Sequence, residues 1–424
     1  MCQLSGPPSA LGARGFDVER LLTPDEARRR VRETLVLEPR GTERVALDDA
    51  LGRVLAVDAA AHDDQPAFAR STMDGFALDS RGGSAPRRIA GAVRMGHPAP
   101  QGVGIDEALR IPTGGALPSG ADAVVPFEDV AERDGAIFLT ATIEPGSFVT
   151  QRGEDVAAGE VVLRAGRRLG GPEIGVLATL GHAEVAVWRR PRIGIISTGD
   201  ELVAPEQRPA PGQVRDSNRY AIAASLRAMG CVAIHLPRCP DDPGALAGAL
   251  AAAVDACDAV VLTGGSSVGE GDLVPRTLAS LGPPGPIVHG LRVKPGKPTV
   301  IGAVGSVLVI GLPGNPTSAL TILEAVVAPL VAALTGATDA RPAAVAATAS
   351  ADFVGRENWT WFVPARLHGL REAPLAAPLV LRSAHVALPA RAAGYVTVGP
   401  QRARIAAGEP LLVARYSAGG APVE

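Results

Sequence analysis

Two acidic residues follow a glycine- and serine-rich turn in the stretch AVVLTGGSSVGEGD, residues 259–272. The apolar residues 259–262 predict a strand, and LVPRTLASL after the turn predicts a helix. Backbone N–H groups between a strand and a helix can hold an anion, but Glu270 and Asp272 would repel a phosphate unless a divalent cation lay between them. The stretch therefore predicts a Mg²⁺-bridged oxyanion site, and the alternative interpretation is a plain turn.

Further carboxylates follow other predicted strands. Glu201 comes after the apolar residues 193–196, and Asp241 comes after CVAIHLP, residues 231–237. Because the carboxyl ends of parallel strands meet at one edge of a sheet, we expect these two acids to converge with Glu270 and Asp272 around one cation. The alternative is a set of exposed helix caps, since Asp241 or Asp242 is also the expected cap of the next helix.

Two lysines bracket a stiff turn in RVKPGKPTVIG, residues 292–302. Lys294 and Lys297 lie on either side of Pro295 and Gly296, in a chain that is poor in lysine. A single surface lysine needs no explanation, but two ammonium groups held near each other match phosphate or a tetrahedral metal oxyanion. We therefore predict an oxyanion clamp at this turn.

Two polar loops interrupt the apolar runs of the N-terminal half. The loop STMDG, residues 71–75, is either a plain Ser/Thr/Asp/Gly turn or a loop from which Asp74 projects into a site. The loop PTGGALPSG, residues 112–120, either connects two strands or brings the hydroxyl of Thr113 to a ligand. No Ser/His/Asp order with an elbow motif occurs in the sequence, so acyl transfer has no support.

The elements that must position these residues predict a multidomain α/β plus β protein. From Arg192 onwards strands and helices alternate, which predicts a doubly wound α/β domain with a parallel sheet. A helix is predicted after the cap Thr23 and Pro24, and short strands follow it. The predicted division is a flexible leader (1–22), a discontinuous domain I (23–61 and 142–190), an inserted β-rich domain II (62–141), the α/β domain III (191–338) and a small β-barrel-like domain IV (339–424).

Composition narrows the class of protein. The 424 residues carry a formal net charge of −3, which argues against a nucleic-acid-binding surface. The four cysteines, at positions 2, 231, 239 and 257, show no C-x-x-C spacing, so a disulfide framework or a structural zinc site is not expected. No signal-like start occurs, and Gly, Pro or charged residues interrupt the apolar runs. We expect a soluble cytoplasmic protein without a membrane partner.

In combination, these motifs resemble the MoeA family of molybdopterin molybdenumtransferases, which is related to the E domain of gephyrin. The motifs, in chain order, are STMDGFA (71–77), RIPTGGALPSGADAVV (110–125), RGEDVAAGE (152–160), STGDELV (197–203), GQVRDSN (212–218), GGSSVGEGD (264–272), KPGKP (294–298) and GLPGNP (311–316). The resemblance implies an elongated, four-domain homodimer that inserts molybdate into adenylylated molybdopterin, with Mg²⁺-dependent release of AMP. It also implies that domain II of one subunit faces domain III of the other, and it makes the molybdopterin adenylyltransferase a candidate partner.

The resemblance assigns roles to individual residues. It implies catalytic residues Asp74, Thr113, Glu201, Asp241 and Asp272, of which Glu201, Asp241 and Asp272 are the candidate Mg²⁺ ligands. The substrate- and oxyanion-binding residues that it implies are Thr198, Gly199, Gly264, Gly265, Ser266, Ser267, Gly269, Lys294, Gly296, Lys297, Pro313, Gly314, Asn315 and Pro316.

The last domain departs from the family pattern. In RSAHVALPARAAG, residues 382–394, Arg382 stands for a glycine, Leu388 for a serine and Ala393 for an asparagine. Two other functions stay open: a molybdopterin adenylyltransferase-like enzyme, which shares the α/β domain, and a gephyrin-like scaffold without catalysis.

Overall fold

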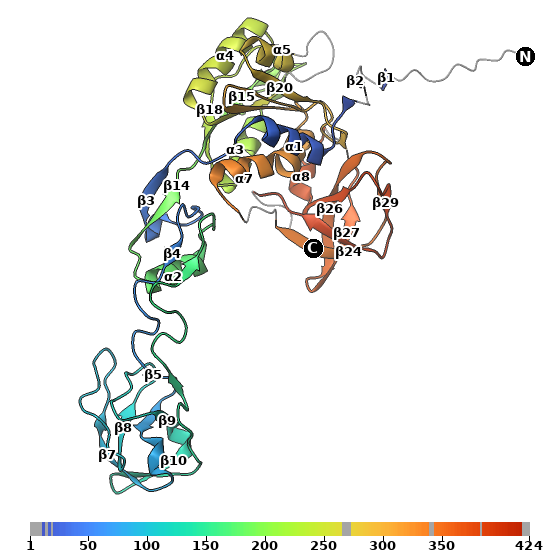
Figure 1. Cartoon of the computed structure of the whole chain (residues 1–424). Helices are drawn as coiled ribbons and strands as arrows, with labels where there is room; N and C mark the ends of the chain where they lie inside the picture. The colour runs from blue at the N-terminus through green and yellow to red at the C-terminus, as the bar shows by residue number, and fades with distance from the viewer. Residues whose placement is uncertain are drawn as a thin grey trace, which may run out of the picture. The chain divides into compact units, whose positions relative to one another are not determined.

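The computed structural model describes residues 11–12, 16–17, 20–264, 273–338, 343–381 and 384–417 (Figure 1). The chain divides into two units. Unit 1 comprises Met1–Glu43, Gly52–Val54 and Val187–Glu424, and unit 2 comprises Arg44–Leu51 and Leu55–Ala186. Glu270, Asp272 and the loop residues Gly265, Ser266, Ser267 and Gly269 lie outside the described residues, as does Arg382.

A six-stranded sheet forms the centre of unit 1. Its strand order is β18–β15–β19–β23–β22–β20, and the first four strands run parallel, as the sequence predicted. The last two do not continue that pattern, because β22 runs antiparallel to β23, and β20 runs antiparallel to β22. The bounds are Val232–His235 for β18, Arg192–Ser197 for β15, Ala259–Thr263 for β19, Val307–Leu312 for β23, Val300–Val304 for β22 and Pro284–His289 for β20.

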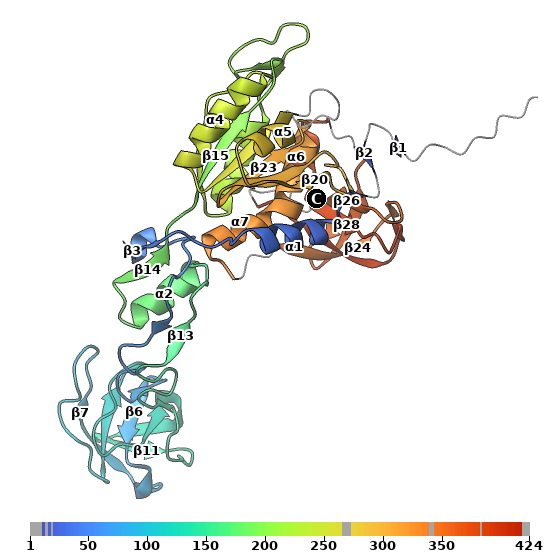
Figure 2. The ribbon, with the colours of Figure 1, turned by 45° about the horizontal axis from the view of Figure 1, so that its top comes forward.

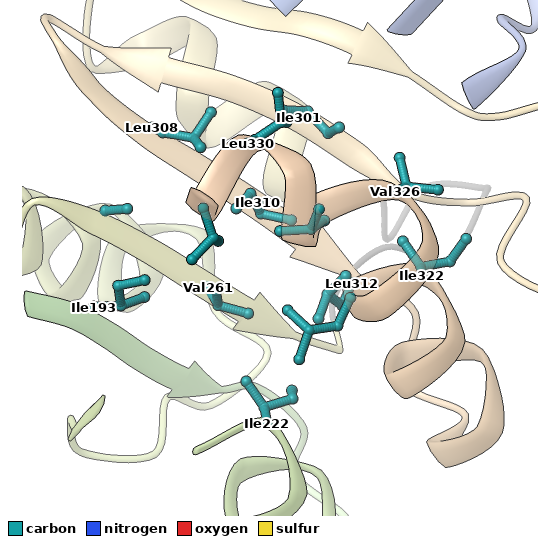
Figure 3. Close-up of a cluster of buried hydrophobic side chains, with 14 of the residues drawn as sticks. Ile193, Ile222, Val261, Ile301, Leu308, Ile310, Leu312, Ile322, Val326 and Leu330 are labelled. Atoms are coloured by element: carbon teal, nitrogen blue, oxygen red, sulfur yellow. The ribbon is translucent and has the colours of Figure 1, made fainter. Parts of the chain in front are cut away.

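Helices cover both faces of this sheet, because alternate side chains of each buried strand point to opposite faces. On one face, Val261 and Ile310 pack with Ile322 and Leu330 of the helices (Figure 3). On the other face, Val260 and Leu262 pack with Leu246 and with Val274. The helices are α1 Pro24–Thr34, α3 Asn218–Ala228, α4 Pro243–Ala256, α5 Leu273–Ser280, α6 Pro316–Ile322, the π-helical turn η5 Leu323–Val327 and α7 Ala328–Thr335.

The start of α1 confirms a prediction from sequence in atomic detail. Thr23 Oγ1 accepts a hydrogen bond from Glu26 N–H at 3.3 Å, and Glu26 Oε2 accepts one from Thr23 N–H at 2.8 Å. Pro24 occupies the first turn, where no backbone N–H is needed. Hydrogen bonds from the backbone N–H and the hydroxyl of Thr23 both lower the pKa of Glu26, and the N–H bond has the larger effect.

The joined helices α6, η5 and α7 span Pro316–Thr335, which is long and apolar enough to cross a membrane by length and composition. Two thirds of the most apolar window, 67%, is buried inside the protein, as for a core helix of a soluble domain. The sequence predicted that Gly, Pro or charged residues would interrupt every apolar run of this length. Glu324 and Pro329 lie within this segment, but they do not make it too short or too polar to cross a membrane by length and composition.

A closed barrel of five strands follows in the C-terminal part of unit 1, which confirms the predicted barrel-like domain (Figure 2). The ring runs β26–β27–β24–β30–β28 and closes by pairing of β28 with β26. Strand β21, Val293–Lys294, adds to β26 in parallel. The bounds are β24 Ala344–Ala349, β26 Thr360–Leu370, β27 Ala373–Pro378, β28 Gly394–Val398 and β30 Pro410–Ala414, with β25 Phe353–Val354, β29 Arg404–Ile405 and α8 Leu388–Arg391 beside them.

Unit 2 holds a second six-stranded sheet, of order β10–β11–β7–β8–β6–β9. Its strands are β10 Val130–Arg133, β11 Ala136–Leu139, β7 Arg87–Ala92, β8 Glu107–Ile111, β6 Gly75–Leu78 and β9 Ala123–Pro126. Its other elements are η2 Leu47–Asp49, β4 Ala59–Ala60, β5 Arg70–Ser71, η3 Ser80–Gly82, η4 Phe127–Asp129, β12 Val149–Thr150, β13 Val161–Leu163 and α2 Gly171–Thr179. The remaining short strands of the chain are β1 Leu11–Gly12, β2 Phe16–Asp17, β3 Thr42–Ala46, β14 Glu184–Trp188, β16 Leu202–Val203 and β17 Val214–Arg215.

Candidate functional site

A cavity of about 980 Å³ opens at the carboxyl ends of β15, β19 and β23 in unit 1. This is the edge at which ligands bind in open α/β sheets. Nine of the residues that the sequence singled out line it: Thr198, Gly199, Glu201, Asp241, Gly264, Pro313, Gly314, Asn315 and Pro316. Loops that follow separate strands therefore meet at one edge of the unit 1 sheet, and they bring together two of the four predicted acids, Glu201 and Asp241.

The ends of β15 and β19 are joined closely at the floor of this cavity. Ser197 and Thr263 are paired in the parallel ladder, and Thr198 N–H donates to Thr263 O at 2.9 Å. Gly264 has a φ of +99°, and a Cβ atom there would lie 2.3 Å from Thr198 O. Only glycine fits this position, because both its backbone conformation and the close backbone approach exclude a side chain.

Asn218, at the start of α3, ties two of the loops together. Its Nδ2 donates to Thr263 Oγ1 at 2.9 Å and to Gly314 O at 2.7 Å. Asp216, two residues earlier, also lines the cavity, and its Oδ2 is buried without a hydrogen-bond partner among the described residues. Neither residue was predicted from the sequence as part of the site. The signal was the motif GQVRDSN, which contains both.

Glu201 and Asp241 bring two exposed carboxylates to the cavity. The structure resolves which of two acids caps α4, because Asp242 Oδ1 accepts from Ala245 N–H at 2.7 Å. Asp241 is thereby left to face the cavity, while its own N–H donates to Asp200 Oδ1 at 3.3 Å. Buried Cys239 lies close to these acids, and burial, together with the charges of Asp241 and Asp242, raises the pKa of its thiol.

These carboxylates do not amount to a complete metal site. In the part of the chain that the structure describes, no group of three or more His, Cys, Asp or Glu side chains could hold a metal ion. The other two acids of the predicted cluster, Glu270 and Asp272, lie outside that part.

The lysine turn is followed directly in the sequence by a residue that lines the cavity. Pro298 lines the cavity, whereas Lys294, Gly296 and Lys297 are not among the described lining residues. Lys297 is half-buried, and its carbonyl accepts from Leu291 N–H at 2.9 Å. Lys294 is exposed, and its Nζ lies 4.2 Å from the ring centroid of Trp361 in the barrel. Neither predicted clamp lysine therefore lines the cavity, and Lys294 lies over an aromatic ring of the barrel.

In unit 2, the two polar loops meet each other. Thr113 N–H donates to Asp74 Oδ1 at 2.7 Å, and Gly114 N–H donates to Ser71 O at 2.8 Å. Directly after the first loop, Gly75 allows β6 to approach β9 closely, because a Cβ atom there would lie 1.9 Å from Val125 O. Asp74 and Thr113 are both exposed, so they form a polar patch at the surface of unit 2.

The chain is similar to known proteins over most of its length. Residues 22–181 match the MoeA N-terminal region (domain I and II), and residues 194–333 match a probable molybdopterin binding domain. A molybdopterin molybdenumtransferase of Haemophilus influenzae is 36% identical over 74% of this chain and 78% of its own length. A protein of the same name from Synechocystis is 32% identical over 87% of this chain and 94% of its own length.

Solved structures extend the likeness to the fold. The molybdopterin biosynthesis moeA protein from Pyrococcus horikoshii OT3 matches with a TM-score of 0.83 at 26% identity, over 93% of this chain and 100% of that chain. The names of the relatives favour the transferase over the adenylyltransferase-like alternative. Because the two family matches cover more than half of the sequence and relatives align over most of their length, the chain belongs to the MoeA family, the molybdopterin molybdenumtransferases of molybdenum cofactor biosynthesis.

Proposed function

We propose that this enzyme inserts molybdate into adenylylated molybdopterin and releases AMP from the cavity at the carboxyl edge of the unit 1 sheet. The observation that carries this proposal is the lining of that cavity. It combines two exposed carboxylates, Glu201 and Asp241, with the loop backbone at Gly314, just beyond the end of the parallel strand β23. Backbone N–H groups at such strand ends suit phosphate oxygens, and carboxylates suit a cation that accompanies the phosphates.

Glu201 and Asp241 are the described residues that would hold Mg²⁺, with Asp272 as a third candidate ligand. Mg²⁺ prefers oxygen donors and commonly takes only one or two carboxylates, with waters and substrate phosphates completing its shell. The donor set therefore fits the ion. When bound, Mg²⁺ would neutralise negative charge on the phosphate groups as AMP leaves.

The other cavity residues act by position. Asn218 keeps the ends of β19 and β23 at a fixed separation through its two donor bonds, so the backbone at Gly314 is held in place before substrate arrives. Lys294 and Lys297 supply ammonium groups for the tetrahedral oxyanion of molybdate. Each of these roles is a consequence of the polar groups present and of the anionic substrates proposed.

We further propose that the active enzyme is a cytoplasmic homodimer, in which Asp74 and Thr113 from the partner subunit complete each site. What supports this is the exposure of the Asp74–Thr113 pair, whose carboxylate is oriented by a backbone N–H but keeps its second oxygen for another contact. The substrate would come from a molybdopterin adenylyltransferase, since an adenylylated pterin must be made by adenylyl transfer.

The test is a direct assay of the purified full chain with adenylylated molybdopterin, molybdate and Mg²⁺. AMP and molybdenum cofactor are expected as products, and both should disappear when molybdate or Mg²⁺ is omitted. A folded protein that binds substrate but releases no AMP under these conditions would support the scaffold alternative and overturn the proposal.

A further inference from the structure

The lysine turn is unusual in composition. Lys294 and Lys297 are the only lysines in a chain with 41 Lys and Arg residues. The other Lys or Arg positions all hold arginine, so these two positions carry an ammonium group where the rest of the chain carries guanidinium. Ammonium is a compact point charge, whereas guanidinium is a broad planar fork.

The backbone of Lys294 is set by the barrel. Strand β21 pairs in parallel with β26, in the register Val293↔Thr360 and Lys294↔Trp361. Thr360 N–H also donates to Arg292 O at 3.0 Å. Lys294 is thus the last residue of a short strand whose neighbour belongs to a closed sheet.

The side chain of Lys294 is set by the same neighbour. Its Nζ lies 4.2 Å from the ring centroid of Trp361, within the range of a cation–π interaction. Trp361 is itself fixed, since it pairs with Val398 on β28 and packs against the barrel core.

This contact holds the ammonium without cancelling its charge. Among the described residues, no carboxylate oxygen lies within 4.0 Å of Lys294 Nζ. An acidic partner would neutralise the charge that attracts an oxyanion, whereas the face of an indole attracts a cation and adds no net negative charge. An exposed lysine on a flexible stem is otherwise free to sample many rotamers.

We propose that Trp361 is a positioning residue for Lys294, through which the barrel domain contributes to oxyanion binding. The inference rests on the proposed function, in which Lys294 contacts molybdate. The inference gives the barrel a role in oxyanion binding through Trp361. The segment 382–394, which departs from the family pattern, does not offer polar groups for that role at two of its altered positions. Leu388 and Ala393, which replace polar residues of the family pattern, are buried at 8% and 0% exposure and face the protein interior.

The test measures the KM for molybdate and the affinity for molybdate alone in Trp361→Leu, Trp361→Phe and the wild-type enzyme. Because Trp361→Leu loses the cation–π contact, we expect its KM and Kd for molybdate to rise by about 2- to 30-fold. Its kcat should be nearly unchanged. Trp361→Phe keeps an aromatic face and should recover most of the loss. Trp359→Leu is the matched control, because Trp359 lies two residues away and its ring is 5.8 Å from the Arg356 guanidinium instead.

A double-mutant cycle separates this inference from the proposed function. The effect of Trp361→Leu should vanish in a Lys294→Ala background and persist in a Lys297→Ala background. If Lys294→Ala itself leaves molybdate binding unchanged, the oxyanion role of Lys294 fails. If Lys294→Ala weakens binding but Trp361→Leu does not, or does so equally in both backgrounds, the positioning role of Trp361 fails. Melting temperatures of all variants show whether a loss comes from unfolding of the barrel.

Discussion

The Asp74 carboxylate accepts a hydrogen bond from Thr113 N–H at 2.7 Å, which joins two turns that are 39 residues apart in the chain. The bond uses one carboxylate oxygen and orients the other at the surface of unit 2. It gives the acid a fixed position in a loop without burying its charge, as suits a residue that contacts a ligand.

Asp74→Asn should separate the charge of this residue from its structural role. The asparagine oxygen still accepts from Thr113 N–H, so we expect the melting temperature to change little, while AMP release falls by about 10²-fold or more. Asp74→Ala, which also removes the acceptor, should lose stability as well as activity. Normal AMP release by a well-folded Asp74→Asn enzyme would remove this residue from the catalytic set.

Mixed dimers test whether each site uses residues of both subunits. At a Mg²⁺ concentration far below that required by Asp241→Asn, we expect the Asp74→Asn and Asp241→Asn enzymes to be nearly inactive alone and to regain activity when their subunits are exchanged. With random exchange, about a quarter of the sites would combine two intact halves, so AMP release should reach about a quarter of the wild-type rate. Mixtures that stay as inactive as their components, despite proven exchange, would place both acids in the site of a single subunit.

The cavity acids should determine the requirement for Mg²⁺. We expect Glu201→Gln and Asp241→Asn each to raise the Mg²⁺ concentration for half-maximal AMP release by about tenfold or more, because each removes a charged oxygen donor. Asp242→Asn is the control, since asparagine caps a helix as well as aspartate does and Asp242 caps α4. An equal Mg²⁺ requirement in all three variants would contradict the assignment of the acids to the cation.

Glu324 should make stability depend on pH. Its side chain is 2% exposed, and Ser417 Oγ donates to its Oε2 at 2.6 Å. Burial raises its pKa above the ordinary 4.5, with the bonds from Ser417 and Ser225 acting in the opposite direction. Between pH 4.5 and the raised pKa, the folded state therefore holds a proton that the unfolded state releases, so stability falls as pH rises through this window.

Glu324→Gln should remove this dependence. We expect its melting temperature to exceed that of the wild type by about 2 °C or more at pH 8 and by less at pH 4.5, as calorimetry across pH can show. Asp352→Asn is a control with the opposite pH dependence. Hydrogen bonds from Arg404 and from Ala407 N–H lower the pKa of Asp352. Its contribution to the free energy of unfolding is therefore present at neutral pH and is lost only as pH falls. If the melting temperature of Glu324→Gln depended on pH in the same way as that of the wild type, Glu324 would not titrate in this range.

Local features of the fold could be predicted from the sequence because short-range chemistry determines them. The capping box at Thr23 and Glu26 depends on residues three apart, and the buried strands β15 and β19 are apolar runs that end in polar turns. Glycine at position 264 also has a local signature, since a Gly-Gly-Ser-Ser run after a strand indicates a turn. The family motifs follow the same rule, because each lies within a few consecutive residues.

Long-range pairings were decided by the tertiary structure. The sequence could not choose between Asp241 and Asp242 as the cap of α4, could not foresee that β22 and β20 run antiparallel, and left Asn218 out of the site. Trp361 gave no signal at all, because its contact with Lys294 exists only after a barrel closes and recruits β21. By itself, the sequence determined which residues are chemically able to bind a metal oxyanion and a phosphate. Which of them meet was decided by strand register and barrel closure, since contacts between residues far apart in the chain depend on the packing of the whole domain.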